Sequence, residues 1–162
     1  MSYDIYIGNA ELESEWPGED GPVAEWTVKG HAEPDAPTFP GDFMTLNGNS
    51  RHPGYSQWAD FCRQVGLYDL FFAEWEGLMC EHPGIAVLKP EHLAVVKAAR
   101  ELWSAQRPSA IAGWDFDPIF GGKNSVDDGV RGRDGNLARL LWLEWWMDWT
   151  LRTCERPALH NR

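Results

Sequence analysis

The stretch LARLLWLEWWMDWTLRTC, residues 137–154, decides the fold, because it holds four of the ten tryptophans in the chain. When its residues are placed at about 100° intervals around a helix axis, Glu144, Asp148 and Arg152 fall in one narrow stripe. Apolar side chains occupy most of the remaining circumference, so other elements have to enclose this helix. The carboxylates of Glu144 and Asp148 argue against a membrane span, because ionised groups are costly in hydrocarbon. The stretch therefore predicts the central helix of a domain.

The sequence also marks the two ends of this helix. Asn136 can accept hydrogen bonds from the free amides at its start, and Asp134 adds negative charge there. Pro157 prevents the helix from continuing far past Arg156, because proline lacks the amide hydrogen that a helix interior needs. We therefore expect a helix that begins beside Asn136 and ends near Cys154.

The length and the cysteine content indicate one domain in a reducing compartment. A chain of 162 residues can bury a core without metal or disulfide bonds, so we expect a single domain, 1–162. Cys62, Cys80 and Cys154 are odd in number and lack CxxC spacing, which favours reduced thiols in a cytoplasmic protein. The first residues, MSYDIYIGNAEL, contain no basic region and no apolar core of the signal-peptide type, so we expect no export.

The negative charge is concentrated at the N-terminal side of the chain. The formal net charge is −11, and residues 1–60 hold eleven acidic side chains against two basic ones. Such a surface repels nucleic-acid backbones, which disfavours sequence-independent binding of DNA or RNA, so we expect no nucleic-acid partner. Two explanations stay open: the charge serves solubility, or it forms a docking face for a basic protein partner.

The pattern along the chain predicts strands followed by helices. Alternating apolar residues indicate strands at 2–7, 10–16 and 23–29, with a turn at Gly8-Asn9 between the first two. Ser56 and Pro90 mark the starts of helices. The predicted helices before the tryptophan-rich one span 56–65, 68–79 and 90–106. We expect an α+β fold in which a small N-terminal antiparallel β-meander packs on about four helices, the helix 137–154 being central.

The glycine-rich loop 108–135 offers a candidate site for an anion. Glycines let backbone amides converge, a helix start carries partial positive charge, and lysine and arginine pair with phosphate oxygens. The loop does not match a Walker motif, because Asp117 and Asn124 stand at two of its required positions. Aromatic rings suit base stacking, so the expected ligand is a small nucleotide-type molecule. The candidate ligand-binding residues here are Trp114, Lys123, Asn124, Arg131 and Arg133, while a plain solvated loop is the alternative.

Carboxylates in the same loop suggest a different chemistry. Asp115, Asp117, Asp127 and Asp128 offer oxygen ligands for a divalent cation, but their spacing does not fit an EF-hand. The histidines show no zinc-binding spacing, and His52 and His82 belong to two HPG turns. We therefore expect no resident metal and no cofactor, and a metal-assisted hydrolase is kept as an alternative function.

The charged stripe of the tryptophan-rich helix is the last candidate. Asp148 and Arg152 can pair along the helix, whereas Glu144 and Asp148 repel each other unless a cation or an outside arginine intervenes. The stripe is either a solvated seam or part of a ligand site flanked by tryptophans.

Several segments of the sequence resemble an uncharacterised family of small acidic proteins from bacteria and their viruses. These segments are SYDIYIG (2–8), GYSQWADFCRQVGLYDLFF (54–72), LMCEHPG (78–84), LKPEHL (88–93) and LLWLEWWMDW (140–149). The resemblance covers most of the chain and implies an intracellular protein with an accessory or host-conflict role. No activity or catalytic residue is carried over with it.

These observations favour a non-enzymatic binding protein. The leading expectation is capture of a small anionic, nucleotide-type signalling ligand by the residues of the glycine-rich loop, aided by Glu144, Asp148 and Arg152. The alternatives are the metal-assisted hydrolase and an acidic protein that masks a basic protein partner.

Overall fold

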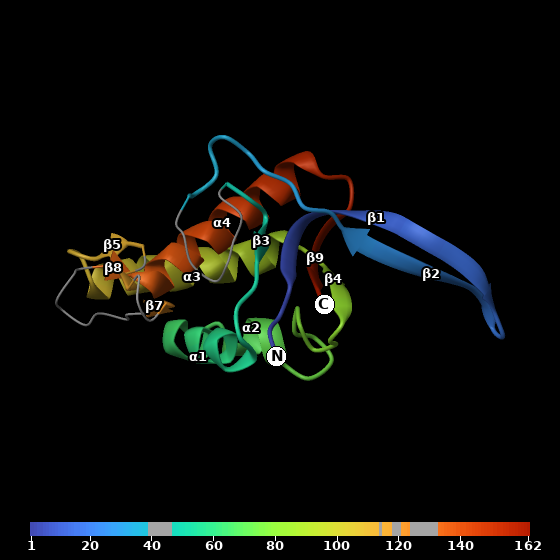
Figure 1. Cartoon of the computed structure of the whole chain (residues 1–162), viewed down its shortest axis with the longest axis horizontal. Helices are drawn as coiled ribbons and strands as arrows, with labels where there is room; N and C mark the ends of the chain where they lie inside the picture. The colour runs from blue at the N-terminus through green and yellow to red at the C-terminus, as the bar shows by residue number, and fades with distance from the viewer. Residues whose placement is uncertain (39–46, 114, 118–120, 124–132) are drawn as a thin grey trace.

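The computed structural model describes residues 1–38, 47–113, 115–117, 121–123 and 133–162 (Figure 1). Its main sheet is antiparallel, with strand order β2-β1-β9-β4 and β3 paired to the start of β1. Four helices accompany this sheet, so the predicted α+β class is confirmed. The strands of this sheet are β1 (Ile5–Gly18), β2 (Gly21–Val28), β3 (Ser50–Arg51), β4 (Gly84–Val87) and β9 (Pro157–Asn161). The helices are α1 (Tyr55–Val65), α2 (Tyr68–Phe72), α3 (Pro90–Gln106) and α4 (Gly135–Thr153).

The strand β1 runs through the position where the sequence predicts a turn. Gly8 pairs with Ala158 of β9, and the chain continues straight into the half of β1 that pairs with β2. A Cβ atom on Gly8 would lie 3.0 Å from Cγ1 of Val28, so this glycine permits close packing and does not turn the chain. The predicted turn at Gly8-Asn9 is wrong, and the first two predicted strands are one strand with a bulge between Leu12 and Ser14.

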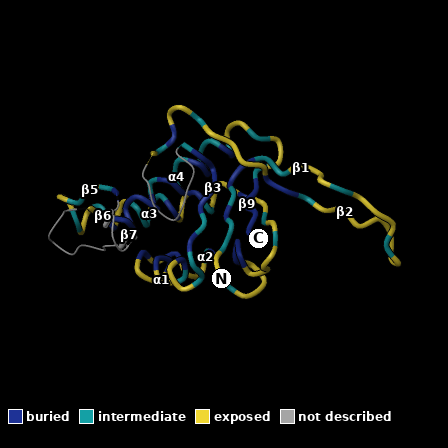
Figure 2. Tube along the Cα trace, viewed as in Figure 1, coloured by how far each residue is buried: buried dark blue, intermediate teal, exposed yellow. Residues whose placement is uncertain are grey.

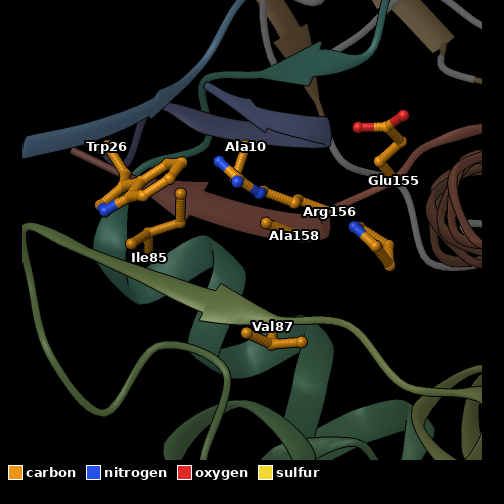
Figure 3. A pocket seen from close by; sticks show the side chains of 8 residues that line it. Ala10, Trp26, Ile85, Val87, Glu155, Arg156 and Ala158 are labelled. Atoms are coloured by element: carbon orange, nitrogen blue, oxygen red, sulfur yellow. The ribbon is translucent and has the colours of Figure 1, made fainter. Parts of the chain in front are cut away.

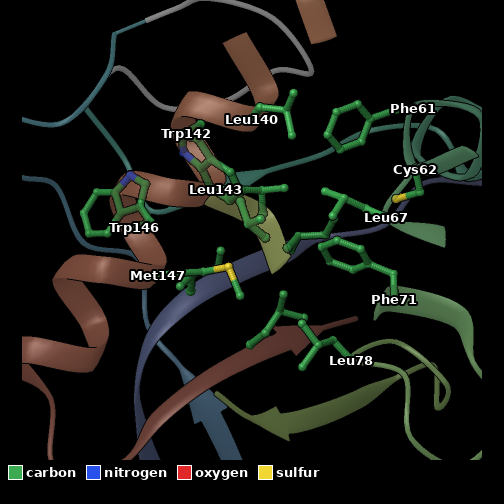
Figure 4. Packing of buried hydrophobic residues seen from close by; sticks show 14 of the residues in the cluster. Phe61, Cys62, Leu67, Phe71, Leu78, Leu140, Trp142, Leu143, Trp146 and Met147 are labelled. Atoms are coloured by element: carbon green, nitrogen blue, oxygen red, sulfur yellow. The ribbon is translucent and has the colours of Figure 1, made fainter. Parts of the chain in front are cut away.

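The helix α4 lies at the centre of the core, as its tryptophans predict. Trp142, Leu143, Trp146 and Met147 have no exposed surface, and Figure 4 shows Leu140 and Leu143 on the side of α4 that faces Phe61 and Leu67. The Trp142 indole nitrogen donates to the carbonyl oxygen of Gly48, and the Trp146 ring meets the His31 ring edge-on, so α4 is covered on a second side as well. Its start differs in one respect from the expectation. Asp134, and not Asn136, caps the helix, because the Asp134 carboxylate accepts a hydrogen bond from the amide of Leu137 at 2.9 Å.

The other helices follow the sequence pattern with two corrections. α3 has the predicted bounds, whereas α1 begins at Tyr55 after an N-cap at Gly54 instead of at Ser56. α2 ends at Phe72 and does not reach Met79, because the chain turns back after it. The amides of Leu78 and Met79 then donate to the carbonyl oxygens of Leu70 and Phe71, which keeps their side chains in the core without a helix.

Short strands occupy the described parts of the loop 108–135. β5 (Ile111–Ala112) pairs in parallel with β8 (Arg133–Asp134), and β6 (Asp115–Asp117) pairs with β7 (Gly121–Lys123). None of the helices that the structure describes has the length and apolar character needed to cross a lipid bilayer. The three cysteines are free thiols, and burial raises the pKa of the Cys62 thiol above its ordinary value.

Candidate functional site

The residues predicted to bind an anion lie only in part within the described structure. Trp114, Asn124 and Arg131 fall outside it, and Lys123 is described only as the last backbone position of β7. Arg133 is exposed and opens β8, immediately before the start of α4. Nucleotide-type binding by this loop therefore stays a prediction.

The start of α4 is already occupied by a carboxylate of the chain itself. Asp134 is 3% exposed, and its second oxygen accepts a hydrogen bond from the indole nitrogen of Trp103 at 2.7 Å. An external anion at the Leu137 amide would displace or face this buried negative charge. The partial positive charge of α4 thus stabilises Asp134, and the anion-binding prediction depends on the loop side chains alone.

The charged stripe on α4 is held in ion pairs with α3. Two hydrogen bonds, at 2.7 and 3.1 Å, link the Arg100 guanidinium to the Glu144 carboxylate, and they raise the pKa of Arg100 above its ordinary value. Asp148 pairs with Arg152 at 2.7 Å and lies 3.7 Å from the ammonium of Lys97. Arg100 is the outside arginine whose presence relieves the repulsion between Glu144 and Asp148.

A hollow of about 460 Å³ adjoins this stripe. Glu144, Asp148, Lys97 and Trp145 line it, together with Asp35, Pro37 and Leu141. The structure therefore brings two of the predicted stripe residues to a cavity, while Arg152 is not among its lining residues.

The carboxylates proposed for metal binding are only partly described. Asp115 and Asp117 are the ends of β6, and Asp127 and Asp128 lie outside the described residues. Within the described ranges, no group of three or more His, Cys, Asp or Glu side chains is placed to hold a metal ion. The hydrolase alternative gains no support from this part of the chain.

The most prominent surface feature is the hairpin of β1 and β2, which projects away from the body (Figure 1). We call residues 11–27 of this hairpin the arm. The arm contains six acidic side chains and no lysine or arginine, and all six are exposed (Figure 2). They are Glu11, Glu13, Glu15, Glu19, Asp20 and Glu25. Lys29 at its foot pairs with Glu11 at 2.7 Å, so one carboxylate is matched by a neighbouring cation.

Apolar residues near the tip of the arm accompany these carboxylates. Trp16 and Val23 lie opposite each other in the strand pairing and are 45% and 44% exposed. Pro17 pairs with Pro22 next to them, and two prolines in register restrict the backbone where the hairpin narrows. The tip thus presents an aromatic side chain on a stiff support.

A groove lies on the main sheet at the foot of the arm (Figure 3). We call it the sheet groove; its volume is about 570 Å³. The residues that line it are Ala10, Trp26, Ile85, Val87, Glu155, Arg156, Pro157 and Ala158. The Arg156 guanidinium stacks over the Trp26 ring at 4.6 Å from its centroid, so the cation covers one aromatic wall.

A hydrogen-bonded chain of side chains joins one of the HPG turns to α1 and β9. The amide nitrogen of Asn161 donates to the carbonyl oxygens of Glu81 and Gly84, so its oxygen faces His82 and accepts from Nδ1 at 2.7 Å. Nε2 of His82 then accepts from the Tyr55 hydroxyl at 2.6 Å. The sequence assigns His82 to a turn and gives no sign of these partners, which lie 27 and 79 positions away. Asn161 is fully buried and fully engaged, so this chain fastens the end of β9 to α1.

Comparison of the chain with models of known families, with curated proteins and with solved structures finds no match in any of the three. The function is therefore inferred from the described surface of the chain itself.

Proposed function

We propose that this chain is a non-enzymatic binding protein that docks a basic protein partner through its acidic arm. The observation that carries the proposal is the arm itself, where six exposed carboxylates and no basic side chain lie on a projecting hairpin. Proteins with complementary charge associate faster and more selectively, because long-range attraction steers their encounter.

The arrangement of the carboxylates leaves repulsion that a cationic partner would relieve. Glu25 lies opposite Ser14, and Glu13 and Glu15 flank Ser14 in β1, so three carboxylates lie within a short length of the narrow hairpin. The hydroxyl of Ser14 donates to Glu25 at 3.1 Å, which satisfies an oxygen without neutralising the charge. Like charges placed close together in a sheet are destabilising, and bound lysine or arginine side chains would reverse the sign of this contribution.

The exposed apolar residues distinguish this arm from a surface that serves solubility alone. A solubilising surface favours isolated charges and avoids large exposed apolar side chains. Trp16 and Val23, in contrast, are large apolar side chains that are exposed near the tip of the arm. Tryptophan is among the residues that most often dominate binding energy in protein interfaces. Charge on the arm would guide the partner, and Trp16 would anchor it.

The test compares two variants of equal charge in affinity capture from an extract of cells that naturally make the protein. In the arm variant, the six arm carboxylates are changed to the corresponding amides. In the body variant, six exposed carboxylates elsewhere are changed in the same way: Asp69, Glu74, Glu76, Glu81, Glu91 and Glu101. We expect the unaltered chain and the body variant to retain a protein of basic pI, and the arm variant to lose it.

Salt provides the second measurement. The retained protein should elute as salt approaches about 1 M, where the screening length falls to about 3 Å. Retention of the same proteins by the arm variant and the unaltered chain would refute docking through the arm.

A further inference from the structure

The sheet groove lies on a face that antiparallel sheets usually leave polar. Ile7 and Leu159 are buried in the core, so alternation places Gly8, Ala10 and Ala158 on the opposite face. On this face β4 contributes Ile85 and Val87, which are 38% and 67% exposed. A solvated sheet face normally carries polar side chains, so exposed apolar residues around a groove indicate a surface that a partner covers.

The strand β4 also presents an open edge beside this groove. In the described sheet, β4 pairs with β9 alone and stands last in the strand order. The amide of Leu88 donates to the carbonyl oxygen of Pro157 at 2.9 Å, so the backbone groups of Leu88 face β9. Residues two positions apart direct their backbone groups to the same side, so Ala86 faces β9 whereas Ile85 and Val87 face outward. Among the described residues, no backbone hydrogen bond outside the strand ladders engages Ile85 or Val87.

An open strand edge beside an apolar groove is the arrangement that binds an extended peptide as an added strand. An extended peptide adds to a sheet edge through backbone hydrogen bonds, and alternate side chains enter pockets on one face. The groove volume of about 570 Å³ lies within the usual range for ligand pockets, about 300–1,000 Å³. Pro83 and Pro90 flank β4, which limits the edge that such a peptide can extend.

The charge around the sheet groove indicates which kind of segment binds there. Trp26 belongs to both the arm and the sheet groove, so a segment seated in the groove lies at the foot of six carboxylates. Within the lining itself the exposed Glu155 carboxylate is balanced by the Arg156 guanidinium on Trp26, so the carboxylates of the arm set the sign of the charge around the groove. A second copy of the chain is disfavoured, because each copy carries a net charge of −11.

From these features we infer that the β4 edge and the sheet groove bind an extended segment of the basic partner as an added strand. Its alternate apolar side chains pack against Ile85 and Val87, and its lysine or arginine side chains face the arm. This inference rests on the proposed function for the nature of the partner, and it adds a second contact site with a defined backbone geometry.

The probe is a library of short random peptides displayed on phage and selected on the unaltered protein. The selection is repeated on a groove variant, Ile85→Lys plus Val87→Lys, and on a control variant, Val95→Lys plus Leu102→Lys. The control changes two exposed apolar residues of α3 and adds the same charge. We expect the unaltered and control proteins to enrich peptides in which apolar residues alternate with lysine or arginine. The groove variant should bind them about tenfold or more weakly.

Synthetic peptides test the added strand directly. N-methylation of the peptide amides that would face β4 should abolish binding, whereas methylation of the alternate amides should leave it. The amides of Ile85 and Val87 should become protected from hydrogen exchange when the peptide binds. No enrichment of alternating peptides, or equal effects of the two methylation patterns, would overturn the inference. Concentration-dependent dimerisation that Val87→Lys abolishes would also overturn it, because a second copy would then be the occupant.

The two proposals can fail separately. If the groove variant still captures the arm-dependent basic protein with unchanged affinity, the groove inference fails and docking through the arm stands. If the arm variant captures that protein normally but the selected peptides need Ile85 and Val87, the arm proposal fails and the groove remains a strand-binding site.

Discussion

Arg100 of α3 and Glu144 of α4 are joined by two hydrogen bonds, at 2.7 and 3.1 Å, between side chains that are 27% and 20% exposed. This pair connects the two long helices along a seam that the sequence identifies only as a stripe of charge. Charge-assisted hydrogen bonds contribute about 1.5–3 kcal/mol each when they are partly buried.

The first prediction concerns this pair. Arg100→Met should lower the free energy of unfolding by about 1–3 kcal/mol, because Glu144 then loses its partner in a half-buried position. Urea unfolding of both single variants and of Arg100→Met with Glu144→Gln measures the coupling. The double variant should be more stable than the sum of the two losses implies. Strict additivity would show that the two side chains do not interact in solution.

The second prediction tests whether Asp134, as the structure shows, or Asn136, as the sequence suggests, caps the start of α4. Asp134→Ala removes the acceptor for both the Leu137 amide and the buried Trp103 indole, so it should cost about 2–4 kcal/mol. Asp134→Asn keeps an oxygen acceptor and should cost less. Thermal unfolding measures the change, and an Asp134→Ala protein of unaltered stability would contradict the cap.

Individual elements show which parts of the fold can be predicted from the sequence. The tryptophan-rich helix α4 is predictable because its apolar pattern repeats within a few residues, and packing on most sides leaves little alternative. The strand β9 is missed because its five residues carry no period of their own and pair with β1 and β4, which are distant along the chain. α2 is predicted too long because Leu78 and Met79 continue its apolar spacing, although backbone hydrogen bonds to Leu70 and Phe71 replace the helix.

The arm and the sheet groove can also be predicted only in part from the sequence. The acidity of residues 1–60 is visible in the sequence, but its concentration on a projecting arm depends on how β1 and β2 pair. The sheet groove brings together Ala10, Trp26, Ile85 and Ala158 from four strands, and no local pattern links positions so far apart. Long-range strand pairing sets both features, which is why the sequence alone predicts the charge and misses the groove.

The third prediction concerns pH. Burial is the main cause that lowers the pKa of His160 below its ordinary value, and the nearby Arg162 lowers it further, whereas Glu13 and Glu25 oppose the shift. Nδ1 of His160 lies 3.3 Å from the Val28 amide and accepts from it, which requires the neutral ring. The unfolded chain therefore binds a proton at higher pH than the folded chain does. This contribution to stability is complete above about pH 6.5 and is lost as the pH falls below it.

Urea unfolding between about pH 7.5 and pH 5.5 measures this dependence. His160→Gln should flatten the curve, because glutamine does not titrate in this range. Burial also lowers the pKa of His92, so part of the slope should persist until His92→Gln is added. A curve that keeps its full slope in the His160→Gln variant would assign the dependence to other groups.

The fourth prediction compares two glycines that differ in the space around them. A Cβ atom on Gly8 would lie 3.0 Å from Val28 and 3.3 Å from the Asn49 side chain, whereas one on Gly30 would meet nothing within 4 Å. Gly8→Ala should therefore destabilise the protein by about 1–3 kcal/mol through overpacking where the end of β2 lies beside β1. Gly30→Ala should be neutral or should stabilise it by about 0.4–1 kcal/mol, because alanine restricts the unfolded chain. Urea unfolding of the two variants tests the packing at the foot of the arm. If Gly8→Ala is as stable as Gly30→Ala, then the Val28 side chain does not pack against Gly8 as closely as the structure indicates.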